Sequence, residues 1–195
     1  MSLAPIRFGL VLALMMTVAG TATAQDSTAG RPTAVLVDGP RENDRAPDFS
    51  LAAATREGPA DLWFSLSALR GQVVVLAFYP RDFTSGCTAE LTAFTEQYAE
   101  LFGEDVVLAG ISADSVETHI RFAASLNAPF RLLSDMDQKV ARAYGSADKN
   151  GYNRRTVYVI DRKGRVAYRN LRFGALDPKA YSELKAAVQV AKRAT

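Results

Sequence analysis

The chain has 195 residues, of which 48% are apolar, and its formal net charge at pH 7 is only +2. This length is enough for one domain with a substantial core. The nearly neutral balance, without a basic stripe interleaved with aromatic residues, gives no electrostatic basis for binding nucleic acid.

The first 24 residues have the order of a secretory signal peptide. Arg7 is their only charge, an apolar run covers residues 8–20, and small residues precede Gln25. A positive start, a short apolar middle and a small-residue exit are typical of a cleaved signal. The apolar run is shorter than the roughly 18–20 residues of a spanning helix. We therefore expect cleavage before Gln25, export to the periplasm or the medium, and no stable membrane insertion afterwards.

The segment after the signal is rich in Ser, Thr, Gly, Pro and charge. Residues 25–45 are therefore expected to form a flexible lead-in. We expect the ordered domain to cover residues 46–195, starting with the sequence APDF.

Within that domain, apolar runs alternate with helical patterns. Residues 72–79 (QVVVLAFY) form a short, β-branched run that is typical of a strand covered on both faces. Apolar side chains at three- and four-residue spacing predict a helix over residues 91–101. Residues 106–112 predict a second buried strand, and Ser115 is placed to cap the helix that follows.

The second half of the domain continues the alternation. Its predicted elements are a strand at 130–133, a helix at 137–144, a hairpin with strands at 156–160 and 166–168, and a helix from Asp177 whose buried face carries Leu184, Val188 and Val190. This order predicts an α/β fold, with a mixed sheet covered by helices on both faces. The thioredoxin-like arrangement has this order, as do several other α/β folds.

Cys87 is the one cysteine in the sequence, so no disulfide can form within it. A free cysteine is most often a small buried hydrophobe. Here, however, it follows a buried strand and a turn, in the expected first turn of a helix. Unpaired N–H groups and the positive helix end favour an anion there, and the thiolate is the nucleophilic form of cysteine.

Three residues of the preceding turn are placed to shape a pocket at Cys87. Thr84 is placed to hydrogen-bond the sulfur or a bound oxygen, or only to cap the helix. Pro80 and Phe83 are placed to exclude water while leaving a narrow entry, and Pro80 also ends the strand.

The segment Pro80-x-x-x-Thr84-x-x-Cys87 resembles the active-site signature of the peroxiredoxins. The Phe-Tyr-Pro sequence around its start is similar to the Q-type (bacterioferritin-comigratory) branch. Further matches in order and spacing are APDF at 46–49, GISAD at 110–114, LLSD at 132–135 and VIDRKG at 159–164. Of these, APDF is similar to the opening strand of the family. The resemblance covers most of residues 46–193 and implies a thioredoxin-like fold.

The resemblance also implies a reaction. Cys87 would attack one oxygen of hydrogen peroxide or an organic hydroperoxide and become a sulfenic acid. Thr84, Arg155 and backbone N–H groups would hold the two oxygens, with Gly86 and Phe83 in the substrate-binding turn.

Two charged residues acquire roles by the same resemblance. Arg155 matches the second catalytic cation of the family, although its neighbour Arg154 is an alternative and either arginine can be a surface charge. Glu90 matches a position where the family often has an acid or amide that orients that arginine. An acid near a helix start is also common for dipole reasons alone.

The sequence departs from its relatives at two positions. Many Q-type relatives have a resolving cysteine five residues after the first, where this chain has Thr92, and Ser85 replaces a common proline. Without a second cysteine, an external thiol or an exported thioredoxin-like protein would have to reduce the sulfenic acid. We expect a monomer or a weak homodimer.

Other functions were weighed against this one. A different exported thiol-redox protein normally needs a Cys-x-x-Cys pair or a second metal ligand, and a non-catalytic binding module would not need the whole signature. His119, the one histidine, is expected on a solvated helix position. The alternative is a catalytic role, in which Cys87 and His119 form the dyad of a hydrolase. No zinc-ligand spacing or Gly-rich nucleotide loop is evident, so no metal or cofactor is expected.

Overall fold

The computed structural model describes Met1 and residues 38–194. The predicted signal peptide and residues 25–37 of the lead-in lie outside this part of the chain. In chain order the elements are β1 (Ser50–Thr55), β2 (Gly58–Pro59), β3 (Phe64–Ser65), the 3-10 helix η1 (Ser67–Leu69), β4 (Val73–Phe78), α1 (Ser85–Glu96), α2 (Tyr98–Leu101), β5 (Val106–Ser112), α3 (Val116–Leu126), β6 (Arg131–Ser134), α4 (Lys139–Ala143), β7 (Thr156–Ile160), β8 (Val166–Asn170) and α5 (Pro178–Arg193). None of the helices in the described residues has the length and apolar character needed to cross a membrane.

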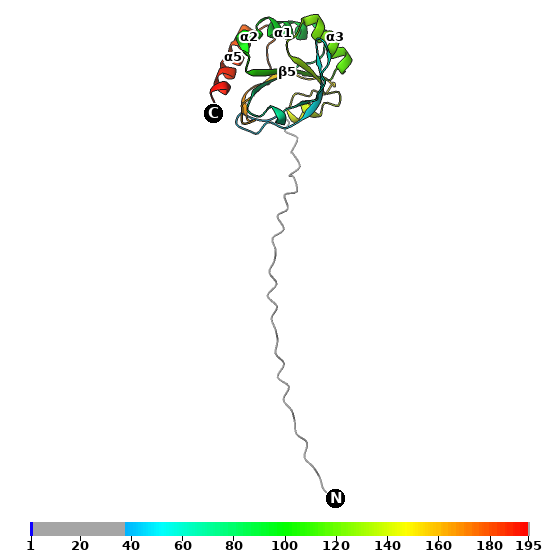
Figure 1. Cartoon of the computed structure of the whole chain (residues 1–195), viewed down its shortest axis with the longest axis vertical. Helices are drawn as coiled ribbons and strands as arrows, with labels where there is room; N and C mark the ends of the chain where they lie inside the picture. The colour runs from blue at the N-terminus through cyan, green and yellow to red at the C-terminus, as the bar shows by residue number, and fades with distance from the viewer. Residues whose placement is uncertain (2–37, 195) are drawn as a thin grey trace. The chain divides into compact units, whose positions relative to one another are not determined.

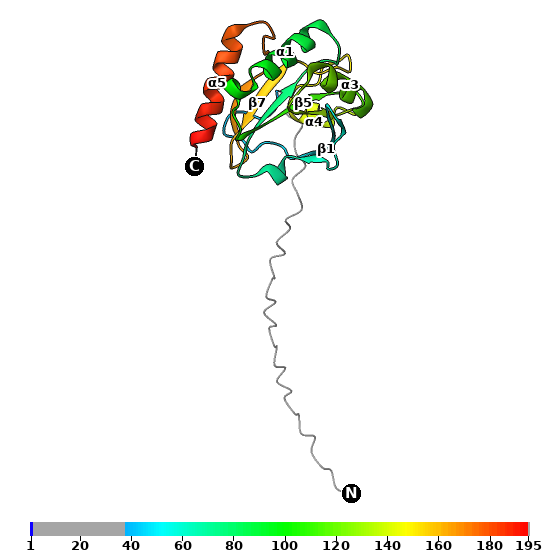
Figure 2. The same ribbon diagram turned by 45° about the horizontal axis from the view of Figure 1, so that its top comes forward.

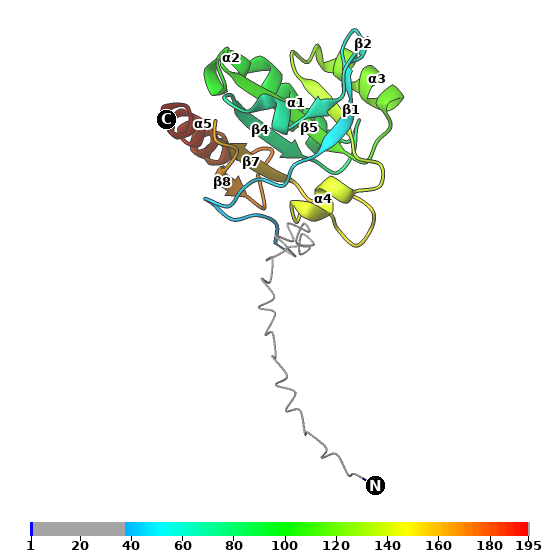
Figure 3. The same ribbon diagram turned by 60° about the horizontal axis from the view of Figure 1, so that its bottom comes forward.

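The strands form one mixed sheet in the order β2-β1-β6-β5-β4-β7-β8, with β3 paired to β1. β4 is central: it runs parallel to β5 and antiparallel to β7. Figure 3 shows α1 and α2 on one side of β4 and β5, and α4 on the other. The predicted α/β fold with helices on both faces is therefore confirmed.

Two cores fill the two faces of the sheet, because side chains alternate along each strand. All six residues of β4 are buried. Val73, Val75 and Ala77 belong to the core that also contains Cys87 and the buried side chains of α1, α3 and α5. The alternate residues of β4 belong to the second core, which α4 covers. Figures 1 and 2 show α5 beside α2 and β7, and the buried side chains of α5 belong to the core that contains Cys87.

Three expectations about the elements are wrong in detail. The helix expected over 91–101 is interrupted, because Gln97 leaves the helical conformation (φ −102°, ψ 17°) and separates α1 from α2. The opening strand begins at Ser50, after the APDF sequence. On α5, Leu184 and Val188 are buried as expected, but Val190 is 64% exposed.

The ordered domain also begins earlier than residue 46. The Asn43 N–H donates to the Val166 carbonyl at 2.8 Å, and the Val166 N–H donates to the Asp44 carbonyl at 3.0 Å. Gly39 and Pro40 are buried. Residues 38–45, expected in the flexible lead-in, thus extend the domain along β8.

Candidate active site

Cys87 lies in the first turn of α1, directly after the loop that leaves β4. The backbone of Thr84 is extended and ends the loop, and the first helical bond runs from the Thr88 N–H to the Thr84 carbonyl at 2.8 Å. The N–H groups of residues 84–87 therefore have no partner within the helix. The Cys87 side chain is 1% exposed. The sulfur thus lies in a nearly closed site at a positive helix end.

Strand register brings Arg155 to this site. β7 runs antiparallel to β4, and Thr156 pairs with Phe78, so the residue before β7 lies beside the end of β4. The Arg155 Nη2 group donates to the Cys87 sulfur at 3.4 Å. The neighbouring Arg154 instead donates to the Gly145 carbonyl. Of the two adjacent arginines, Arg155 is the one at the sulfur.

Gly86 leaves room for that guanidinium. A Cβ at residue 86 would lie 3.2 Å from Arg155 Nη2, which is tighter than most contacts of a real Cβ. The absence of a side chain therefore lets the arginine lie close over the first turn of α1.

Glu90 holds the other side of the guanidinium. It lies one turn after Cys87, is fully buried, and forms an ion pair with Arg155 Nη1 through Oε2. Its Oε1 has no hydrogen-bond partner among the described residues. Burial raises the pKa of Glu90 to about 7, although the charge of Arg155 opposes the rise. Burial lowers the pKa of Arg155, but Glu90 and Cys87 together outweigh this effect and leave it above its ordinary value.

The loop residues predicted to shape the pocket have separate roles. The Thr84 hydroxyl donates to the Arg81 carbonyl at 3.0 Å, which leaves its oxygen lone pairs free to accept a hydrogen bond from the O–H group of a bound ligand. Phe83 is 54% exposed at the surface of the site, and its ring lies 4.8 Å from that of Phe122 in α3. Pro80 is half-buried at the end of β4.

The expectation that His119 is solvated is wrong. The side chain is fully buried in α3. Its Nδ1 lies 2.8 Å from Asp82 Oδ2, and its Nε2 lies 3.1 Å from the Leu133 carbonyl. Both ring nitrogens are thus occupied, and neither serves the Cys87 sulfur. Sequence reasoning also missed Asp82 as a partner of His119. The signal that could have pointed to it is its position, since it is a carboxylate inside the signature segment between Pro80 and Thr84.

Comparison with known proteins agrees with this geometry. Residues 43–169 match the AhpC/TSA family. The chain belongs to the AhpC/TSA family. A peroxiredoxin bcp of Coxiella burnetii is 41% identical over 130 residues, covering 63% of this chain and 83% of that protein. Peroxiredoxin 2 of Thermoplasma acidophilum is 40% identical over 124 residues, covering 60% of this chain and 59% of that protein.

A solved structure carries the same fold. The bacterioferritin comigratory protein of Xanthomonas campestris superimposes with a TM-score of 0.64 at 26% identity, covering 73% of this chain and 92% of that one. The thioredoxin-like fold and the resemblance to the Q-type branch are thereby confirmed, and the enzyme is a peroxiredoxin, a thiol-dependent peroxidase.

Proposed function

We propose that this peroxiredoxin works by a one-cysteine mechanism in which Cys87 is oxidised by the peroxide and then reduced by an external thiol. The observation that carries the proposal is the environment of Cys87. The one cysteine of the sequence lies buried at a helix N-terminus with the Arg155 guanidinium on its sulfur. A guanidinium and unpaired N–H groups beside a nucleophilic sulfur can stabilise the negative charge that develops when the sulfur attacks a peroxide.

In the first half-reaction the thiolate attacks one oxygen of the peroxide ROOH. A sulfur–oxygen bond forms, the O–O bond breaks with its electron pair, and the leaving oxygen takes a proton to give ROH, or water from hydrogen peroxide. Cys87 becomes a sulfenic acid. The charge that develops on the two oxygens would be stabilised by Arg155, which contacts the sulfur, and by the N–H groups of residues 86–87 in the first turn of α1.

In the second half-reaction an external thiol attacks the sulfenic sulfur. A mixed disulfide forms and water leaves. A second thiol then attacks the mixed disulfide, releasing the Cys87 thiolate and an external disulfide. The reductant would be a small thiol or an exported thioredoxin-like protein, and the enzyme would act as a monomer or weak homodimer.

The decisive experiment is stopped-flow oxidation of the reduced protein by one equivalent of hydrogen peroxide, then by tert-butyl hydroperoxide. Intact mass and a sulfenic-acid probe report the state of Cys87. We expect oxidation far faster than that of a free thiol, with the sulfenic acid persisting until a thiol is added and steady turnover afterwards. Oxidation at the rate of a free thiol would instead support a non-catalytic binding module.

The order of the first 24 residues supports the proposal that the enzyme is exported. Expression of the full chain in a Gram-negative host, followed by fractionation and N-terminal sequencing, tests it. We expect a periplasmic protein that begins at Gln25, and a matched Ala24→Arg variant that is not cleaved there. Recovery of an uncleaved chain in the cytosol would overturn the proposal.

A further inference from the structure

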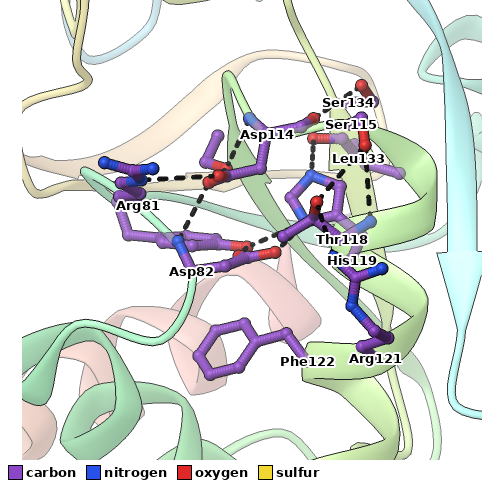
Figure 4. Close-up of polar contacts among 12 residues, drawn as sticks. Arg81, Asp82, Asp114, Ser115, Thr118, His119, Arg121, Phe122, Leu133 and Ser134 are labelled. Carbon is purple, nitrogen blue, oxygen red and sulfur yellow. Dashed lines mark hydrogen bonds and ion pairs between the residues drawn. The ribbon is translucent and has the colours of Figure 1, made fainter.

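A buried polar network lies beside the active-site loop, and peroxide chemistry at Cys87 does not use it directly. Asp82 accepts a hydrogen bond from the Tyr79 hydroxyl at 2.7 Å through Oδ1, and its Oδ2 lies 2.8 Å from His119 Nδ1. His119 Nε2 reaches the Leu133 carbonyl at 3.1 Å. Figure 4 shows His119 of α3 pointing toward Asp82. Tyr79, Asp82 and His119 are all at least nine-tenths buried.

The hydrogen-bond partners of His119 and Asp82 require one hydrogen between Nδ1 and Oδ2. The Leu133 carbonyl only accepts, so Nε2 must carry hydrogen. Tyr79 donates to one oxygen of Asp82. The contact of Nδ1 with the other oxygen then needs a second proton, which either nitrogen or oxygen can hold. The pair is thus a hydrogen bond of 2.8 Å shielded from solvent.

This network fastens the loop between β4 and α1 to the rest of the domain. The Asp82 N–H donates to Asp114 Oδ2 at 2.9 Å, after β5. Next to it, Phe83 has φ +58°, a left-handed conformation that a bulky residue rarely adopts. Such strain persists only where the surroundings fix it. The Asp82 side chain and the packing of Phe83 on Phe122 hold the strained residue from both sides.

We propose that His119 and Asp82 are positioning residues for peroxide reduction. Their buried hydrogen bond holds loop residues 80–84 in the strained conformation that aligns Thr84 and the first turn of α1 with the peroxide. The inference rests on the proposed role of Cys87, because the loop matters only if peroxide reacts there. A misplacement of about 1 Å can slow a reaction by about 100-fold, so a loosened loop should slow oxidation measurably.

Two substitutions of His119 separate its two contacts. The amide nitrogen of asparagine takes the place of Nδ1, and that of glutamine takes the place of Nε2, by the number of bonds from Cβ. His119→Asn therefore keeps a donor to Asp82, whereas His119→Gln keeps only the donor to Leu133. If the loop contact matters, His119→Gln should slow oxidation of Cys87 at least about tenfold, and His119→Asn should slow it much less.

Substitutions of Asp82 give an independent pair. In Asp82→Asn the amide oxygen accepts from Tyr79, and the amide N–H donates to a neutral His119, so every hydrogen bond is kept. Asp82→Ala loses all of them. We expect Asp82→Asn to recover most of the rate that Asp82→Ala loses. Tyr79→Phe removes only the hydroxyl that donates to Asp82. It should slow oxidation less than the loss of the whole network would, and it keeps the proposal testable if Asp82→Ala fails to fold.

A core variant controls for lost stability. Val188 is buried in α5, and Val188→Ala should destabilise the protein without touching the loop. For each purified chain, urea unfolding gives the stability and stopped-flow gives the rate constant with hydrogen peroxide. The proposal is overturned if the four His119 and Asp82 variants all react within about twofold of the parent, or if Val188→Ala slows oxidation equally. Slow oxidation of the parent itself would instead refute the proposed role of Cys87.

Discussion

Glu90 and Arg155 form an ion pair in which the carboxylate side chain is fully buried and the guanidinium side chain is 18% exposed. The pair lies inside the protein because Glu90 follows Cys87 by one helical turn, on the face of α1 that packs against the sheet. Burial makes this carboxylate sensitive to pH in the physiological range, since it raises the pKa from an ordinary 4.5 to about 7.

Glu90 should make both stability and activity depend on pH. Between about 4.5 and 7 the folded protein binds this proton more tightly than the unfolded chain does. The free energy of unfolding should therefore fall as the pH rises through this window, by up to about 3 kcal/mol. Because the carboxylate holds Arg155, the oxidation rate should rise over the same window. Parallel urea titrations and stopped-flow traces of the parent and Glu90→Gln test this, since the variant should lack both changes. Identical pH profiles would contradict the assignment.

Arg155 should be hard to replace even by lysine. One nitrogen of its guanidinium contacts the sulfur and another binds Glu90, and a single ammonium group cannot reproduce this fork. We expect Arg155→Ala to slow oxidation of Cys87 by about 100- to 1,000-fold, with Arg155→Lys recovering only part of the loss. Arg154→Ala is the matched control and should react like the parent. Equal losses at the two arginines would show that the effect is not local to the sulfur.

Gly86→Ala should separate stability from activity. Alanine favours a helix over glycine by roughly 0.5–1 kcal/mol. The new Cβ, however, would lie 3.2 Å from Arg155 Nη2 and push the guanidinium away from its position. Urea unfolding should therefore show unchanged or higher stability while stopped-flow shows slower oxidation. A variant that is both as stable and as fast as the parent would show that the added methyl group does not displace the Arg155 guanidinium.

Restoring a second cysteine in the helix should create a resolving step only if α1 opens. Residues 87 and 92 are five apart in α1, a rise of about 7.5 Å along the axis. Disulfide geometry requires Cα atoms within about 7 Å, so the first turn must unwind. In Thr92→Cys we expect peroxide to give an intramolecular disulfide by mass spectrometry, formed more slowly than the sulfenic acid. Thr92→Ser should give no disulfide. Disulfide formation as fast as oxidation would show that the turn is already open.

Local sequence patterns predicted most of the fold, because strands such as β4 and helices such as α3 have periodicities that depend on near neighbours. The active-site segment was equally local: Thr84, Gly86 and Cys87 lie within one turn of chain. His119 could not be placed this way, because its burial depends on Asp82, 37 residues earlier in the sequence. The short strands β2 and β3 have two residues each and form only through pairing with β1.

The position of Arg155 beside Cys87 depends on the register of β7 against β4 inside the sheet. Thr156 faces Phe78 across the ladder, which places Arg155 at the end of β4. A slip of one residue would turn every β7 side chain to the opposite face, and the cation would leave the cysteine. A one-residue insertion in the segment that enters β7 should therefore inactivate the enzyme even if the domain stays folded. The accuracy of backbone pairing thus decides whether this chain has a reactive thiol or an inert one.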